Sequence, residues 1–170
     1  LYMQEVIKLP QKELSNTCNL SAPTVEKYLF ILEQTYIIKL VRPYNKNIRS
    51  ELSKTPKIFF YDSGLMQMLW LKGLPKEIIG NVFATSVFSE LIKKYGRENI
   101  YYWRTKDKKE IDFIIKNKNR IIPAEVKINF NKAGLSAIRY FLENYRLSEY
   151  RIIGLDGYER KAWQVYPWEI

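Results

Sequence analysis

The chain has 170 residues, enough to bury a core in one domain or in two small ones. With 46% hydrophobic and 15% aromatic residues it is globular rather than disordered. Twenty-eight basic residues against eighteen acidic ones give a net charge of +10, which favours polyanionic partners. Histidine is absent, so histidine general bases, Ser-His or Cys-His pairs and histidine zinc sites are excluded.

Three further features narrow the class of protein. No apolar run approaches the roughly 18 residues of a membrane-spanning helix, and no secretion leader is visible, so we expect a cytoplasmic protein without membrane contact. The single cysteine, Cys18, gives no disulfide and indicates a reducing compartment. No glycine-rich phosphate loop of the Walker or dinucleotide type occurs, so we expect no ATP site in this chain.

The first predicted elements are two helices joined by a turn. A short helix opens at Pro10. Ser21 and Pro23 indicate a second helix, since a serine oxygen accepts a backbone N–H group and proline fits the first turn. We expect this helix to run to about Gln34. Its apolar residues recur at helical spacing and predict a buried stripe of Val25, Tyr28, Leu29 and Leu32.

Two apolar strands, residues 37–41 and 57–61, follow and enclose the most basic stretch of the chain. Two helices and a strand pair predict a winged helix-turn-helix with this stretch as its wing. We expect the wing to contact nucleic-acid phosphates through Lys46, Arg49 and Lys54. The second helix is slightly acidic, which argues against major-groove entry and leaves a packing or docking role open.

A cap and a loop separate this lobe from the next. Asp62 precedes an apolar helix over residues 65–71 and is expected to accept a backbone N–H group of its first turn. Glycine and proline then interrupt the pattern in residues 71–75. We therefore predict a first domain over residues 1–72 and a second over residues 73–170.

The second domain alternates helices and strands. We expect helices over residues 78–95 and 132–145, and strands over residues 100–103, 110–127 as a hairpin, 150–155 in the sheet interior and 162–166 at an edge. This order predicts a mixed sheet with helices on both faces, and an α/β (α+β) fold class for the chain.

The hairpin at residues 110–127 carries the chemistry. Its turn is either Lys118-Asn119 or residues 117–120, and both turns give one register. In that register Asp112 lies opposite Glu125, and Glu110 lies opposite Lys127. Like charges directly opposite each other are destabilising unless something offsets them, and a divalent cation would do so.

Asp112, Glu125 and Lys127 therefore form a candidate catalytic set. The two carboxylates, with the backbone carbonyl of Val126 as a third ligand, suit Mg²⁺ or Mn²⁺, while the ammonium group orients water or stabilises charge. The alternative is a solvated hairpin face on which Lys127 pairs with Glu110. A basic cluster beside the hairpin, with Arg104 and Lys106, adds candidate phosphate contacts.

Four segments, taken in order, resemble one family. They are Lys57-Ile-Phe-Phe-Tyr-Asp-Ser-Gly-Leu65, Tyr102-Trp-Arg104, Glu110-Ile-Asp-Phe113 and Ala124-Glu-Val-Lys127. Together they resemble the C-terminal region of prokaryotic AAA+ ATPases, over nearly all of the chain. The resemblance implies a winged helix followed by a PD-(D/E)xK restriction-endonuclease-like domain of unknown function, both downstream of a nucleotide-binding domain in the same polypeptide.

The chain departs from that family at one position. The family carries a glutamate on the helix before the hairpin, in a pattern like Gly-x-x-Phe-Glu-Asn-x-Val, and this chain reads Gly80-Asn-Val-Phe-Ala-Thr-Ser-Val87. Ala84 stands where the carboxylate that helps to complete the metal site would be, which argues against hydrolysis. Glu90 lies about 240° further round the helix and is a poor substitute.

Two functions follow from the sequence. The first is a nucleic-acid-associated, Mg²⁺-dependent phosphodiester-hydrolysing module, with DNA as the expected substrate. The second is a non-catalytic DNA- or protein-docking module that regulates the upstream ATPase domain. A second copy of the chain is a further expected partner.

Overall fold

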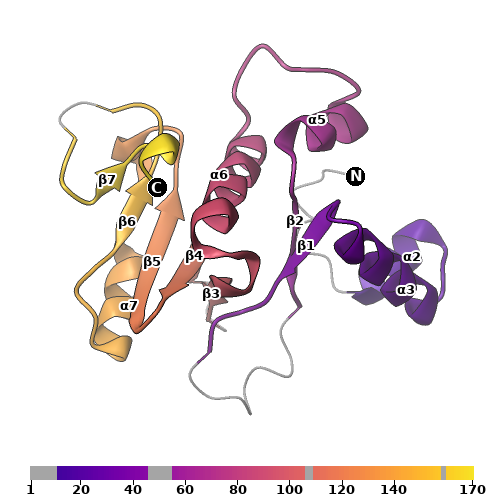
Figure 1. Cartoon of the computed structure of the whole chain (residues 1–170), viewed down its shortest axis with the longest axis horizontal. Helices are drawn as coiled ribbons and strands as arrows, with labels where there is room; N and C mark the ends of the chain where they lie inside the picture. The colour runs from indigo at the N-terminus through magenta and orange to yellow at the C-terminus, as the bar shows by residue number, and fades with distance from the viewer. Residues whose placement is uncertain (1–10, 46–54, 106–108, 158–159) are drawn as a thin grey trace.

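The computed structural model describes residues 11–45, 55–105, 109–157 and 160–170. Its strands form a two-stranded and a five-stranded sheet (Figure 1). In chain order the elements are α2 (Gln11–Cys18), α3 (Ala22–Gln34), β1 (Ile38–Val41), β2 (Lys57–Phe60), α5 (Ser63–Leu71), α6 (Gly80–Tyr95), the 3₁₀ helix η1 (Arg97–Asn99), β3 (Ile100–Arg104), β4 (Glu110–Asn117), β5 (Arg120–Val126), η2 (Phe130–Lys132), α7 (Ser136–Tyr145), β6 (Arg151–Ile153), β7 (Gln164–Val165) and η3 (Pro167–Glu169).

The second helix, α3, begins and ends as predicted. The Ser21 side chain accepts the N–H group of Thr24 at 3.3 Å, and the helix ends at Gln34. The predicted buried stripe is wrong at Tyr28, which is 54% exposed, whereas Val25 is buried. Tyr28 lies about 60° round the helix from Val25, at the margin of the apolar stripe.

The strands β1 and β2 pair antiparallel, with Ile38 opposite Phe60 and Val41 opposite Lys57. This confirms the predicted strand pair. Most of the basic stretch between the strands, including Lys46, Arg49 and Lys54, lies outside the described residues. Whether the two helices and this strand pair form a winged helix stays a prediction.

The cap of α5 and the end of α6 are those that the sequence predicts. Asp62 accepts the N–H group of Leu65 at 2.7 Å and so caps α5. The long helix α6 ends at Gly96, whose N–H group donates to the carbonyl of Ile92 at 2.9 Å. Gly96 has a φ of +83°, a backbone conformation that favours glycine.

The five-stranded sheet has the order β3-β4-β5-β6-β7. The pairs β3–β4 and β4–β5 are antiparallel, while β5–β6 and β6–β7 are parallel. The sheet is therefore mixed, with β6 in its interior and β7 at its edge, as the sequence predicts. The α/β (α+β) class is confirmed.

Helices cover both faces of this sheet, as Figure 1 shows for α6 and α7. Phe88 and Leu91 of α6 are fully buried in one apolar cluster with Phe113 of β4. Ile138 and Phe141 of α7 are buried in a second cluster on the other face. Each fully buried side chain of this size contributes about 2 kcal/mol to folding, so both faces of β4 and β5 are strongly held.

The start of α7 differs from the prediction. The expected helix began at residue 132, but α7 begins at Ser136 and is preceded by the separate turn η2. Asn129 caps that turn by accepting the N–H group of Asn131 at 2.8 Å, and Ala133 is extended. The local side-chain cap and the buried ring of Phe130 hold these residues in a turn rather than in the helix.

The strand pair β1–β2 shares its core with the large sheet. Val41 and Phe59 lie in the same buried cluster as Phe88, and the rings of Phe59 and Phe88 stack with centroids 4.9 Å apart. Figure 1 shows α6 between this strand pair and the five-stranded sheet. The domain division at residue 72 stays a prediction.

Candidate functional site

The site lies at the open end of the β4–β5 hairpin, opposite its turn. The two strands pair from Phe113 opposite Ala124 to Asn117 opposite Arg120, which is the predicted register. The turn consists of the two residues Lys118 and Asn119, the shorter alternative. Lys118 has a φ of +53°, the left-handed conformation that tight hairpin turns require.

A bulge sits at Asp112. Tyr101 pairs with Ile114 and Trp103 with Ile111, so Asp112 and Phe113 together face the single residue Tyr102. The bulge explains why Ile111 and Ile114 lie in the same apolar cluster although they are three residues apart. Bulges re-aim side chains, and this one turns the Asp112 carboxylate toward β5. Its Oδ2 accepts the N–H group of Val126 at 2.9 Å.

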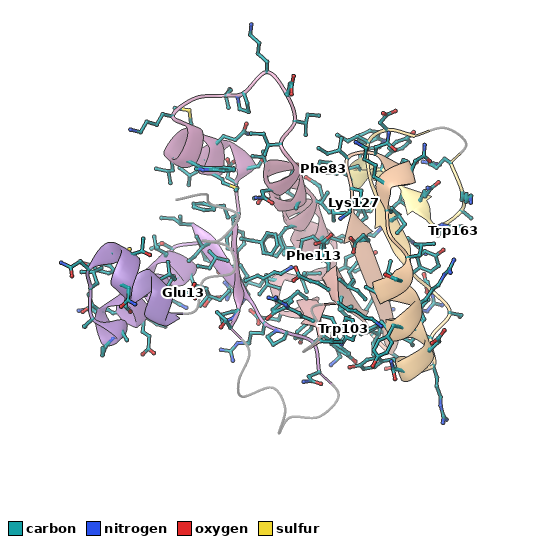
Figure 2. All side chains as sticks on the ribbon, turned by 180° about the vertical axis from the view of Figure 1, so that it is seen from behind. Glu13, Phe83, Trp103, Phe113, Lys127 and Trp163 are labelled. Carbon is teal, nitrogen blue, oxygen red and sulfur yellow. The ribbon has the colours of Figure 1, made fainter. Side chains whose placement is uncertain are left out.

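Lys127 joins the two carboxylates. Its Nζ lies 2.8 Å from Oε1 of Glu125 and 4.0 Å from Oδ2 of Asp112. Figure 2 shows Lys127 in the part of the molecule where Phe83 of α6 lies, away from Trp103. The structure therefore brings the three predicted catalytic residues together, with one cation in contact with both acids.

The alternative pairing of Lys127 with Glu110 stays a prediction, because the charge of Glu110 acts on Lys127 beside those of Asp112 and Glu125. Lys127 lies one residue beyond β5, where its N–H group donates to Ile153 of β6 at 3.0 Å. Its ammonium group is drawn to Glu125 and Asp112, while Glu110 contacts Nζ of Lys57 at 2.5 Å and Nε of Arg104 at 3.7 Å. The hydrogen bond to the parallel strand β6 sets the direction of the chain after Val126. The hairpin register alone does not account for this bond.

The site has unusual electrostatics. Burial raises the pKa of Glu125 to about 7, with a further contribution from the charge of Asp112, although Lys127 opposes both effects. Burial lowers the pKa of Lys127, but the charges of Asp112 and Glu125 outweigh it and the net shift is upward. A positive charge beside Glu125 therefore favours the ionised form of that carboxylate.

The donor set suits a hard divalent ion that retains water. Within the described residues, Oδ1 of Asp112 and Oε2 of Glu125 accept no hydrogen bond, so each acid keeps an open oxygen. No group of three or more acidic or cysteine side chains that could hold a metal occurs in the described ranges. Two carboxylates fit Mg²⁺, which is commonly held by one or two carboxylates, waters and substrate phosphates. The third ligand expected at the Val126 carbonyl stays a prediction.

The helix position that departs from the resembling family lies in the core. Ala84 is partly buried against the apolar cluster between α6 and the sheet. Glu90, in contrast, pairs with Lys93 at 2.7 Å on the exposed side of α6. Neither residue supplies a carboxylate to the site.

The structure describes only part of the predicted nucleic-acid surface. Arg104 lies at the end of β3, is 40% exposed and pairs with Glu110. Lys106 lies outside the described residues, as do Lys46, Arg49 and Lys54. The nucleic-acid contacts therefore stay predictions.

Two residues near the site are missing from the sequence predictions. Lys57 is placed there in a strand and in a segment that carries the family resemblance, with no role at the site, yet it is buried on the face of β2 that also carries Phe59. Its alternation with Phe59 is the signal that could have revealed this. Gly154 follows β6 and packs on the carbonyl of Lys127, a contact that no local pattern indicates.

Replacing Gly154 by alanine should displace the chain at Lys127. A Cβ atom there would lie 2.6 Å from the Lys127 carbonyl oxygen and 2.9 Å from the ring of Phe130. We expect a loss of unfolding free energy of about 1–3 kcal/mol, measured by denaturant unfolding. Gly73→Ala is the matched control, because a Cβ atom there meets nothing within 4 Å. Equal stability of the two variants would contradict the close approach.

The raised pKa of Glu125 predicts a pH-dependent stability. The folded state holds the Glu125 proton to higher pH than the unfolded state does, so this residue lowers the unfolding free energy as pH rises from about 4.5 to about 7. Glu125→Gln should remove that contribution, and its unfolding free energy should fall less than that of the wild type over this range. Chemical unfolding at a series of pH values measures both curves. Parallel curves would show that burial does not raise the pKa of Glu125.

None of the helices in the described ranges is both long and apolar enough to cross a bilayer.

Residues 3–77 match a family described as "Domain of unknown function (DUF8612)". No solved structure matches the chain significantly.

The curated relatives are distant. "Uncharacterized protein Rv2008c" of Mycobacterium tuberculosis and "Uncharacterized protein Mb2031c" of Mycobacterium bovis are each 24% identical to the chain over 148 residues. The match covers 83% of this chain and 33% of each relative, so the chain spans about a third of their length. Residues 79–169, which hold α6 and the whole five-stranded sheet with its carboxylates, match a further family over more than half of the chain. The chain belongs to the family described as "Domain of unknown function (DUF4143)".

Proposed function

We propose that the chain is a nucleic-acid-associated module of a longer ATPase and that it carries a Mg²⁺-dependent phosphodiester-hydrolysing site. The observation that supports this most directly is the contact of one ammonium group, that of Lys127, with the carboxylates of Asp112 and Glu125. A cation already lies between two acids that come from adjacent strands. A divalent ion would bind at the same position, because the negative potential of the two carboxylates would attract it as well.

The ATPase part of the proposal comes from the sequence resemblance. The four ordered segments resemble the region that follows the nucleotide-binding domain of prokaryotic AAA+ ATPases, and the curated relatives extend well beyond the matched part. The order of α2, α3, β1 and β2 suits the implied winged helix. The mixed sheet with its carboxylates at a hairpin suits the implied PD-(D/E)xK domain.

Each site residue has a distinct role in this proposal. Asp112 and Glu125 hold the ion through their open oxygens, and the Asp112 carboxylate is kept in place by the Val126 N–H group. The ion that these residues would hold would supply Lewis-acid chemistry, namely polarisation of a phosphate and a lower pKa of a coordinated water. Lys127, at 38% exposure, is free to turn from the carboxylates toward a water or a phosphate oxygen. Its charge there would stabilise the developing negative charge of the transition state.

A non-catalytic docking module is the second candidate. Ala84 favours it, because a small, partly buried apolar side chain stands where the resembling family carries a further carboxylate. Such a module would bind DNA or the ATPase domain without hydrolysis. The two candidates differ in whether metal binding is accompanied by cleavage.

Asp112→Asn should weaken divalent-ion binding. The amide keeps the size and the hydrogen-bond acceptor of Asp112 but loses the charge, so the affinity for Mn²⁺ should fall about tenfold or more in calorimetric titration. Any cleavage of supercoiled or branched DNA should disappear with it. Glu143→Gln, on the exposed side of α7, removes the same charge away from the site and should leave affinity unchanged. Equal Mn²⁺ binding by Asp112→Asn and the wild type would refute the metal site.

Ala84→Glu tests whether the missing helix carboxylate limits the site. A third carboxylate should raise Mn²⁺ affinity about tenfold and should raise any cleavage rate. Ala84→Gln is the control, because it adds the same bulk without the charge. If the glutamate variant folds and binds the ion no more tightly than the glutamine variant, this position of α6 does not face the site.

A further inference from the structure

Lys57 is the most buried charged group beside the site. It comes from β2, far from the hairpin in sequence, and its side chain is only 7% exposed. Its Nζ contacts Oε1 of Glu110 at 2.5 Å and lies 5.0 Å from the centre of the Tyr102 ring. Because the residue is enclosed by the strand pair and the sheet, its ammonium group cannot turn out into water.

The backbone holds Lys57 in this position. The Tyr102 hydroxyl donates to the carbonyl of Thr55 at 2.7 Å, two residues before Lys57. The Tyr102 N–H group donates to Arg42 at 3.1 Å, and the N–H group of Tyr44 donates to Tyr102 at 2.6 Å. These bonds tie both strands of the β1–β2 pair to β3 at the end where Val41 lies opposite Lys57, so the Lys57 charge is fixed relative to the large sheet.

The acids at the open end of the hairpin have basic neighbours. Among the residues that the structure describes, Glu110 pairs with Lys57 and Arg104. Asp112 and Glu125 pair with Lys127. The charge of Lys57 also acts on Glu125. Carboxylates that already have basic neighbours attract a divalent cation less than a pair of bare carboxylates would. The basic groups therefore compete with the metal for the same acids.

The two lysines differ in what they can do when an ion arrives. Lys127 is partly exposed and can leave the carboxylates, whereas Lys57 is enclosed and cannot. The repulsion between Lys57 and an incoming ion therefore persists in the bound state. A negatively charged phosphate group beside the ion would offset it.

Taking the metal site of the proposed function as given, we infer that Lys57 is a fixed internal cation of the carboxylate site, which keeps divalent-ion affinity low until a phosphodiester ligand binds beside the ion. Metal and nucleic acid then bind together rather than in sequence. The strand pair β1–β2, through Lys57, takes part in a site whose other members all lie in the five-stranded sheet or directly after it.

Calorimetric titration of Mn²⁺ into wild type and Lys57→Met, with and without a short DNA duplex, tests this role. Without DNA, Lys57→Met should bind Mn²⁺ about tenfold more tightly, since removing a unit charge near a divalent ion has an effect of this order at intermediate dielectric. Addition of the duplex should tighten Mn²⁺ binding to the wild type more than to the variant. Lys93→Met, which removes an exposed lysine paired with Glu90, is the control and should bind as the wild type does.

The outcomes separate this role from the metal site itself. If Asp112→Asn weakens Mn²⁺ binding but Lys57→Met does not strengthen it, Lys57 is only structural and the metal site stands. If Lys93→Met strengthens binding as much as Lys57→Met, the effect is one of net charge and the inference is overturned. If Asp112→Asn binds as the wild type does, the metal site itself is refuted.

A second comparison covers the case in which Lys57→Met does not fold because Glu110 is left buried without this partner. The double variant Lys57→Met, Glu110→Gln removes both charges of the pair, a change that is often neutral for stability. It should bind Mn²⁺ about tenfold more tightly than Glu110→Gln alone, since the two differ only at Lys57. Equal affinities of these two variants would overturn the inference.

Discussion

The contact of Lys127 with Glu125 and Asp112 is the interaction on which the rest of the site depends. Glu125 is 13% exposed and lies beside a second carboxylate, an arrangement that is unfavourable for two negative charges unless a cation is close. In the protein without a bound ligand, Lys127 supplies that cation. Any ligand that displaces Lys127 must bring positive charge of its own, which is why the proposal centres on a divalent metal ion rather than on a neutral substrate.

The surrounding fold holds this arrangement rigidly. Both faces of β4 and β5 are packed, under α6 on one side and α7 on the other, so a slip by one residue would exchange the side chains of the two faces and disrupt both apolar clusters. The bulge at Asp112 turns its carboxylate to Val126, and β6 with Gly154 fixes the chain at Lys127. Buried apolar surface thus provides the stability, and a few irregular positions direct the charged groups.

The sequence predicts the regular parts of this structure well and the irregular parts poorly. The polar, Asn-rich turn between two apolar runs is enough for the hairpin register, and Ser21, Asp62 and Gly96 mark helix ends by local chemistry. The bulge at Asp112 shifts a register between strands and has no local signature. The pairing of Lys57 with Glu110 depends on packing between distant strands, so no local pattern indicated it. Local signals fix elements, whereas the charge balance of the site arises only from tertiary contacts.

Anomalous scattering from Mn²⁺ in crystals grown with a short DNA duplex tests the central claim most directly. The account predicts a peak about 2.1 Å from carboxylate oxygens of both Asp112 and Glu125, a phosphate oxygen on the same ion, and Lys127 turned away from Glu125. A structure in which Lys127 still bridges the two carboxylates while DNA is bound, with no peak between them, would contradict it and would favour the docking module.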